Sequence, residues 1–64
     1  MVWDEIVIRE CDEQHGIGGI KVVDKQSGVE IVSFKKKQEI IINLSAEETL
    51  ELYLALRRIL RGWL

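Results

Sequence analysis

The sequence predicts an α+β fold, a four-stranded antiparallel meander followed by one C-terminal helix (ββββα), in a single domain spanning residues 1–64. Three observations lead to this prediction. The chain has 64 residues, of which 47% are hydrophobic, so it can form one small core. Over its first two thirds, β-branched residues alternate with polar ones between turn signals. Its last third repeats apolar residues at helical spacing.

Four segments have the composition and alternation of strands. In the second of them, Gly18 and Gly19 predict a bulge or a sharp bend. Gly28 is expected to supply a positive φ in the hairpin turn that follows. The helix is expected to lie on one face of the sheet, against the inward side chains Ile40, Ile42 and Leu44. The expected strands are Val2–Cys11, Ile17–Lys25, Val29–Lys35 and Glu39–Leu44.

The helix is expected over Ser45–Leu64. Ser45 and Glu48 have the spacing of a capping box, in which each side chain bonds the backbone amide of the other residue. Gly62 stands where a left-handed cap could end the helix, with Trp63 and Leu64 folding back.

The apolar surface of this helix is too wide for one contact. Its two adjoining apolar rows cover roughly half of the circumference, whereas a surface helix needs a stripe only somewhat over 100° wide. A short sheet can cover one row, and a second copy of the chain is the simplest cover for the other. A monomer whose sheet curls around the helix is the alternative. The expected dimer interface consists of Leu52, Leu56, Ile59, Leu60 and Trp63.

Composition and charge limit the function classes. The net charge of −2 is unfavourable for a general nucleic-acid binder, although the local distribution of charge matters more than the sum. No apolar run approaches the ~20 residues of a membrane span, and the N-terminus lacks the pattern of a signal peptide. We therefore expect a cytoplasmic protein without a membrane partner.

No set of residues predicts a catalytic site, a metal site or a cofactor. Cys11 and His15 have a spacing found in metal sites, but structural zinc needs four ligands, and the chain has no other Cys or His. A packed thiol beside a loop histidine explains the pair better. The glycine-rich stretch His15–Lys21 does not have the spacing of a phosphate-binding loop. We therefore do not expect an enzyme.

The lysine run Lys35–Lys37 is the one concentrated positive feature. With other basic residues it could form a band on the outer sheet face, where Phe34 or Trp3 could stack on bases. The alternative is a solvated turn whose lysines keep a strand end from pairing with other chains. The candidate nucleic-acid contacts are Arg9, Lys21, Lys25, Phe34, Lys35, Lys36 and Lys37.

The segment Ile20–Leu56 resembles the single-stranded-DNA-binding domain of the positive-cofactor transcriptional coactivator family, a relative of the whirly fold. The hairpin Ile20–Ile31 and the strand-to-helix junction Ile42–Glu48 carry the resemblance. It implies a homodimer with helices at the interface and strands curved to hold DNA. The chain departs from the family pattern at Glu39–Ile41, where the family has a basic residue, lysine and glycine, and at Thr49, where an aromatic residue is usual.

With this resemblance, the sequence predicts a homodimeric module that binds single-stranded nucleic acid, DNA in the first place, and acts in transcription regulation. The alternative is a small protein-interaction or regulatory subunit without a nucleic-acid role. In that case exposed apolar residues near Trp63 and Leu64 would form the docking surface.

Overall fold

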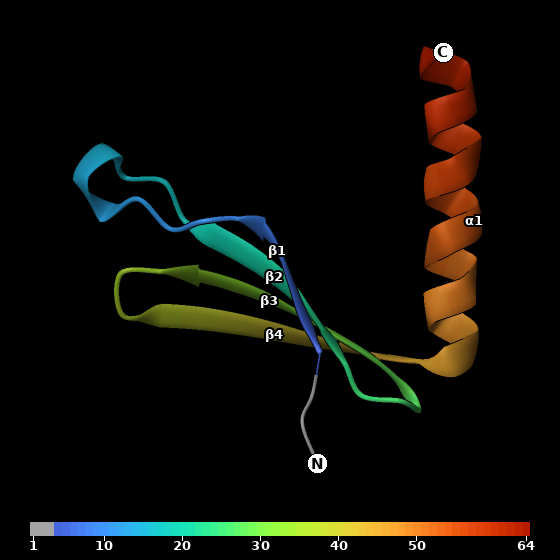
Figure 1. The fold of residues 1–64 in the computed structure, drawn as a ribbon, viewed down its shortest axis with the longest axis horizontal. Coiled ribbons are helices and arrows are strands. Elements are labelled where there is room, and N and C mark those ends of the chain that lie inside the picture. The colour runs from blue at the N-terminus through green and yellow to red at the C-terminus, as the bar shows by residue number, and fades with distance from the viewer. Residues whose placement is uncertain (1–3) are drawn as a thin grey trace.

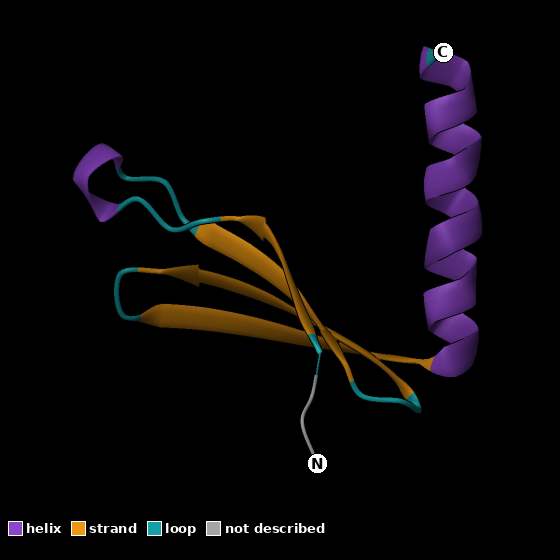
Figure 2. Ribbon diagram, in the orientation of Figure 1, coloured by secondary structure: helices purple, strands orange, loops and turns teal. Residues whose placement is uncertain are grey.

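The computed structural model describes residues 4–64, so the predictions for Val2 and Trp3 lie outside the described residues. The order of elements is ββββα, as predicted, with one short 3-10 turn added after the first strand (Figures 1 and 2). The elements are β1 (Glu5–Arg9), η1 (Glu13–His15), β2 (Gly19–Asp24), β3 (Gly28–Lys35), β4 (Gln38–Ser45) and α1 (Ala46–Trp63).

The four strands form one antiparallel meander in the order β1-β2-β3-β4, which confirms the predicted topology. The predicted irregularity lies in another place. The register shifts in β1, between Val7 and Arg9, and not in the glycine pair that opens β2. Gly18 and Gly19 instead allow close approach, since a Cβ at Gly18 would lie 2.9 Å from the carbonyl oxygen of Phe34.

The turn between β2 and β3 forms at the predicted place by a different mechanism. Gln26, with φ 68°, carries the positive φ that was expected at Gly28. Gly28 is needed because it pairs with Ser45, and a Cβ on it would collide with the backbone carbonyl of Leu44. The prediction for Gly28 was therefore wrong in mechanism, because the constraint comes from the neighbouring strand and not from the turn.

The junction between β4 and α1 contains no loop. Ser45 is the last residue of β4 and also the N-cap of α1. Its hydroxyl accepts a hydrogen bond from the Glu48 amide at 3.1 Å, and the Glu48 carboxylate accepts one from the Ser45 amide at 3.0 Å. The Thr49 hydroxyl adds a bond to the Ser45 carbonyl oxygen at 2.7 Å. The predicted capping box is confirmed, and it fixes the first turn of the helix directly on the end of the strand.

The predicted left-handed cap at Gly62 is wrong. Gly62 lies inside α1, which continues through Trp63, and the Leu64 amide still donates to the Leu60 carbonyl oxygen at 3.1 Å. Among the described glycines only Gly16, with φ 68°, has a positive φ. The regular hydrogen-bond ladder therefore extends past Gly62 without needing a reversal of the chain.

The two faces of the sheet differ in burial. Val23 and Val32, at 6% and 2% exposure, are the only buried hydrophobic residues among those described, and the register places them on one face. The opposite face, which we call the isoleucine face, is mostly apolar, with Asp24 and Ser33 as polar members. Its apolar members are Ile6, Ile20, Val22, Val29, Ile31, Ile40, Ile42 and Leu44.

The helix does not cover the sheet, contrary to the prediction. It contacts β3 and β4, but along its length only Thr49 and Leu52 are half-buried, and Figure 1 shows α1 rising away from the end of β4. Ile40 and Ile42, which were expected to point into the core, remain 63% and 51% exposed. The reason is the loop-free junction, which gives the helix no length of chain with which to turn back over its own sheet.

Candidate nucleic-acid interface

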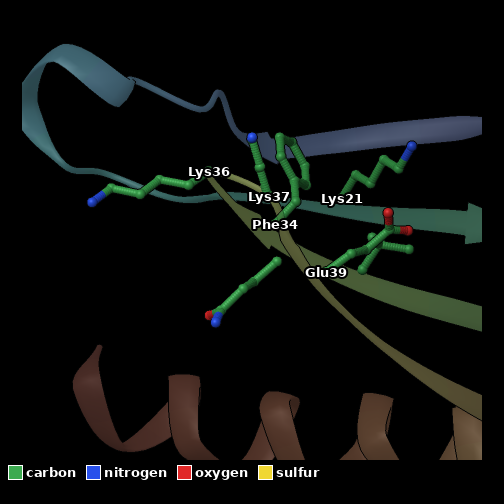
Figure 3. A pocket seen from close by; sticks show the side chains of 7 residues that line it. Lys21, Phe34, Lys36, Lys37 and Glu39 are labelled. Carbon is green, nitrogen blue, oxygen red and sulfur yellow. The ribbon is translucent and has the colours of Figure 1, made fainter.

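A pocket of about 350 Å³ lies at the end of the β3–β4 hairpin. Figure 3 shows the ring of Phe34 between Lys37 and Lys21, with Lys36 extending away from it. Strands β2, β3 and β4 and the turn between β3 and β4 supply the lining. We call this site the hairpin pocket; its lining residues are Lys21, Val32, Phe34, Lys36, Lys37, Gln38 and Glu39.

The sheet register places Phe34 in the pocket. Phe34 pairs with Gly19 on β2 and with Glu39 on β4, so these three residues lie side by side across the sheet. Gly19 is buried, and a Cβ on it would overlap the Phe34 ring. The ring therefore lies directly over the Gly19 backbone, with a half-buried position that leaves part of it open to solvent. An apolar ring surface is thus available for stacking.

The lysines of the turn reach the pocket through a two-residue connection. Lys36 and Lys37 link Lys35, the last residue of β3, to Gln38, the first of β4. Lys36 has φ 55°, a left-handed conformation that glycine or asparagine adopts more readily than lysine. The turn therefore presents two charged side chains where two small residues would form the same connection at lower conformational cost.

The charge of the pocket is positive but partly balanced. Lys21, Lys36 and Lys37 contribute three positive charges, and Glu39 contributes one negative charge. The Nζ of Lys21 also lies 3.4 Å from the Glu5 carboxylate on β1. The least balanced positive charge is therefore at the turn, and an anion would approach Lys36 and Lys37 more favourably than Lys21.

The remaining predicted contacts lie elsewhere. The guanidinium of Arg9 donates to the Gly18 carbonyl oxygen at 2.7 Å, which ties β1 to the start of β2. Lys25 lies at the opposite end of β2 and forms a 2.9 Å ion pair with Glu30. Lys35 lines an adjoining hollow of about 570 Å³ together with Lys36, Lys37 and Gln38. The structure thus gathers Lys21, Phe34, Lys36 and Lys37 in the hairpin pocket, whereas Arg9 and Lys25 do not line it.

Sequence reasoning missed three residues of the pocket, Val32, Gln38 and Glu39. The sequence nevertheless contained a signal that predicts Glu39 as a neighbour of Phe34. A two-residue turn at Lys36 and Lys37 pairs Lys35 with Gln38 and Phe34 with Glu39, so the acidic side chain beside the ring follows from counting residues.

Comparisons of the chain with protein-family models, with curated proteins and with solved structures find no match.

The Cys11–His15 segment forms a local turn. The Asp12 carboxylate accepts from the His15 amide at 3.3 Å and lies 2.6 Å from the Nδ1 atom of the His15 ring. Cys11 is half-buried beside this turn. Within residues 4–64, no three Cys, His, Asp or Glu side chains are grouped so that they could hold a metal ion. In the same part of the chain, α1 lacks the apolar character that a membrane-crossing helix requires.

The predicted interface residues other than Leu52 lie on the uncovered side of α1. Leu52 is half-buried, whereas Leu56, Ile59, Leu60 and Trp63 are exposed, with Trp63 at 75%. Part of this side forms a shallow hollow of about 430 Å³, which we call the helix groove. Its lining residues are Tyr53, Leu56, Arg57, Leu60, Arg61 and Leu64. The apolar face predicted from the sequence is therefore real and uncovered in the single chain, and the dimer stays a prediction.

Proposed function

We propose that this chain is a non-enzymatic, homodimeric module that binds single-stranded nucleic acid, with DNA as the expected ligand and transcription regulation as the expected process. The observation that supports the proposal is the hairpin pocket, which combines the open ring of Phe34 with Lys21, Lys36 and Lys37. Aromatic rings beside a positive groove are the usual elements of single-strand binding, because any base can stack and any phosphate can pair.

The parts of the pocket suggest distinct roles. A base would stack on Phe34, which is fixed over Gly19 and loses little freedom on binding. The flanking phosphates would lie toward Lys36 and Lys37, since Glu39 and Glu5 weaken the positive potential around Lys21. The net charge of −2 is compatible with this arrangement because the positive side chains are concentrated at one hairpin.

A fluorescence titration with a labelled oligo(dT) tests the proposal. The protein should bind at low salt and lose affinity steeply as salt rises. Phe34→Leu, which keeps an apolar side chain and removes the stacking surface, should weaken binding by about 5- to 150-fold, the equivalent of ~1–3 kcal/mol per stacked base. The control is Ile17→Leu before β2, which lies outside the hairpin pocket and outside the helix groove and should leave binding unchanged. Absence of binding at low salt, or equal losses in both variants, would contradict the proposal.

A second candidate is a protein-interaction or regulatory subunit, which the helix groove and the exposed Trp63 and Leu64 favour. The same titration separates the two candidates. A protein that binds no oligonucleotide at low salt and stays monomeric would support this alternative, because its apolar helix would then need a different protein as its cover.

A further inference from the structure

We propose that the isoleucine face of each protomer is covered by α1 of a second copy, so that two chains exchange their helices reciprocally. This inference rests on the homodimer of the proposed function and adds what that proposal leaves open, namely which surfaces meet. The dimer predicted from the sequence involved the helix alone. The structure adds the sheet face as the surface that receives it.

The exposed area of the chain is too large for a compact monomer. The accessible surface is 5662 Å², whereas a folded monomer of 7.4 kDa exposes about 4,200 Å², a difference of roughly 1,500 Å². Obligate dimers bury about 1,000–2,500 Å² on each partner, so the excess has the size of one stable interface. The radius of gyration, 13.6 Å against about 11 Å for a compact chain of this length, agrees with this conclusion.

Two apolar surfaces account for the excess, and they lie on different elements. On the sheet, Ile6, Ile40 and Ile42 are each more than half exposed on the isoleucine face. On the helix, Leu56 and Ile59 continue the row that begins with the half-buried Leu52. Packing of helix against helix would leave the isoleucine face in water, and packing of sheet against sheet would leave the helices in water. Packing of each helix against the partner's sheet covers both the isoleucine face and the helix. It needs only one kind of contact, which occurs twice around a twofold axis.

The junction explains why the partner's sheet, and not the chain's own, receives the helix. The end of β4 and the start of α1 meet at Ser45 without a loop, and the capping box fixes that corner. A chain that cannot fold an element back onto itself satisfies the same contact with a second copy, which is the logic of domain swapping. The dimensions match, since the 18 residues of α1 span about 27 Å and the 8 residues of β4 about 26 Å.

Methyl NMR on a mixed sample tests this arrangement without changing the sequence. One preparation carries ¹³C-labelled isoleucine methyls and the other carries ¹³C-labelled leucine methyls; the two are unfolded together and refolded. Contacts between the two labels then arise only between different chains. We expect NOEs from Ile40 and Ile42 to Leu56 and Leu60. Ile41 is the matched control, because it lies on the same strand and points to the other face of the sheet.

The outcomes separate this inference from the proposed function. A dimer by sedimentation whose intermolecular NOEs lack Ile40 and Ile42 would overturn the helix exchange and leave the homodimer intact. A monomer at millimolar concentration would overturn both the exchange and the homodimer. The oligo(dT) titration reports on the hairpin pocket independently, so loss of nucleic-acid binding with the NOEs present would refute only the binding function.

Discussion

The ring of Phe34 lies over Gly19, so close that a Cβ at Gly19 would overlap the ring atoms. The two residues are paired across β2 and β3, and the missing side chain on one strand is the space that the ring of the other occupies. This pairing holds the one aromatic side chain of the hairpin pocket in place, so that the glycine affects both stability and the proposed binding.

Gly19→Ala should therefore destabilise the fold by about 1–3 kcal/mol, because the methyl group displaces the Phe34 ring. Urea denaturation followed by circular dichroism measures the change. Gly62→Ala is the matched control, since its Cβ would meet nothing within 4 Å and alanine favours a helix interior, and it should stabilise by up to about 1 kcal/mol. Equal effects of the two substitutions would show that the ring does not depend on Gly19.

Lys37→Gln should weaken oligo(dT) binding several-fold at low salt. It should also lower the slope of log affinity against log salt by about 0.7, the value for one lost phosphate contact on a single strand. Lys25→Gln removes the same charge at the far end of β2 and should leave the slope unchanged, because that lysine is outside the hairpin pocket and pairs with Glu30. A slope that falls equally in both variants would mean that binding depends on net charge alone.

Lys36→Gly should improve stability and impair binding at once. Relief of the left-handed conformation at φ 55° should stabilise the hairpin by about 0.5–1 kcal/mol. Loss of the ammonium group should weaken binding by a factor similar to that of Lys37→Gln. Thermal denaturation and the oligo(dT) titration, carried out on the same protein, check the two effects. A gain in stability without a loss of affinity would remove Lys36 from the proposed site.

Ser45→Ala should destabilise the chain by about 0.5–2 kcal/mol, because the Glu48 amide loses its acceptor at the start of α1. Ser27→Ala in the turn between β2 and β3 serves as the control and should change stability by less than about 0.5 kcal/mol. Urea denaturation distinguishes them. If both variants unfold at the urea concentration of the parent protein, the corner at Ser45 is not fixed by its cap.

Ile42→Glu should weaken the dimer by at least about 100-fold, since it buries an unpaired charge under the partner's helix. Ile41→Glu, one residue earlier on the opposite face, should leave the dimer intact. Sedimentation equilibrium measures both dissociation constants. Dissociation by the Ile41 variant alone would assign the interface to the other face of the sheet.

The sequence predicts local features of this fold well and distant ones poorly. The order of elements and the capping box depend on residues near one another in the chain, and both are confirmed. The role of Gly28 depends on the Leu44 carbonyl of a neighbouring strand, which no local pattern reveals. The direction in which α1 leaves β4 also cannot be predicted from the spacing of apolar residues. For this reason the helix was expected to pack on its own sheet, which in the structure it leaves uncovered.

In the candidate site, too, the sequence predicted relations between neighbouring residues and missed those between different strands. Lys36 and Lys37 are adjacent in the chain and were expected to act together, as the hairpin pocket places them. Arg9 and Lys25 were grouped with them by charge alone, and neither lines the hairpin pocket. Glu39 was overlooked as a pocket residue because its position beside Phe34 follows only from the pairing across the turn.

The small number of buried side chains has a thermodynamic consequence. Ordering the backbone costs about 1–2 kcal/mol for each residue, and within residues 4–64 only Val23 and Val32 are buried hydrophobic residues. In the proposed dimer, association would supply most of the free energy that opposes this cost, and folding and assembly would then form a single equilibrium. The melting temperature of that dimer would rise with protein concentration, and dilution would shift it toward the unfolded chain.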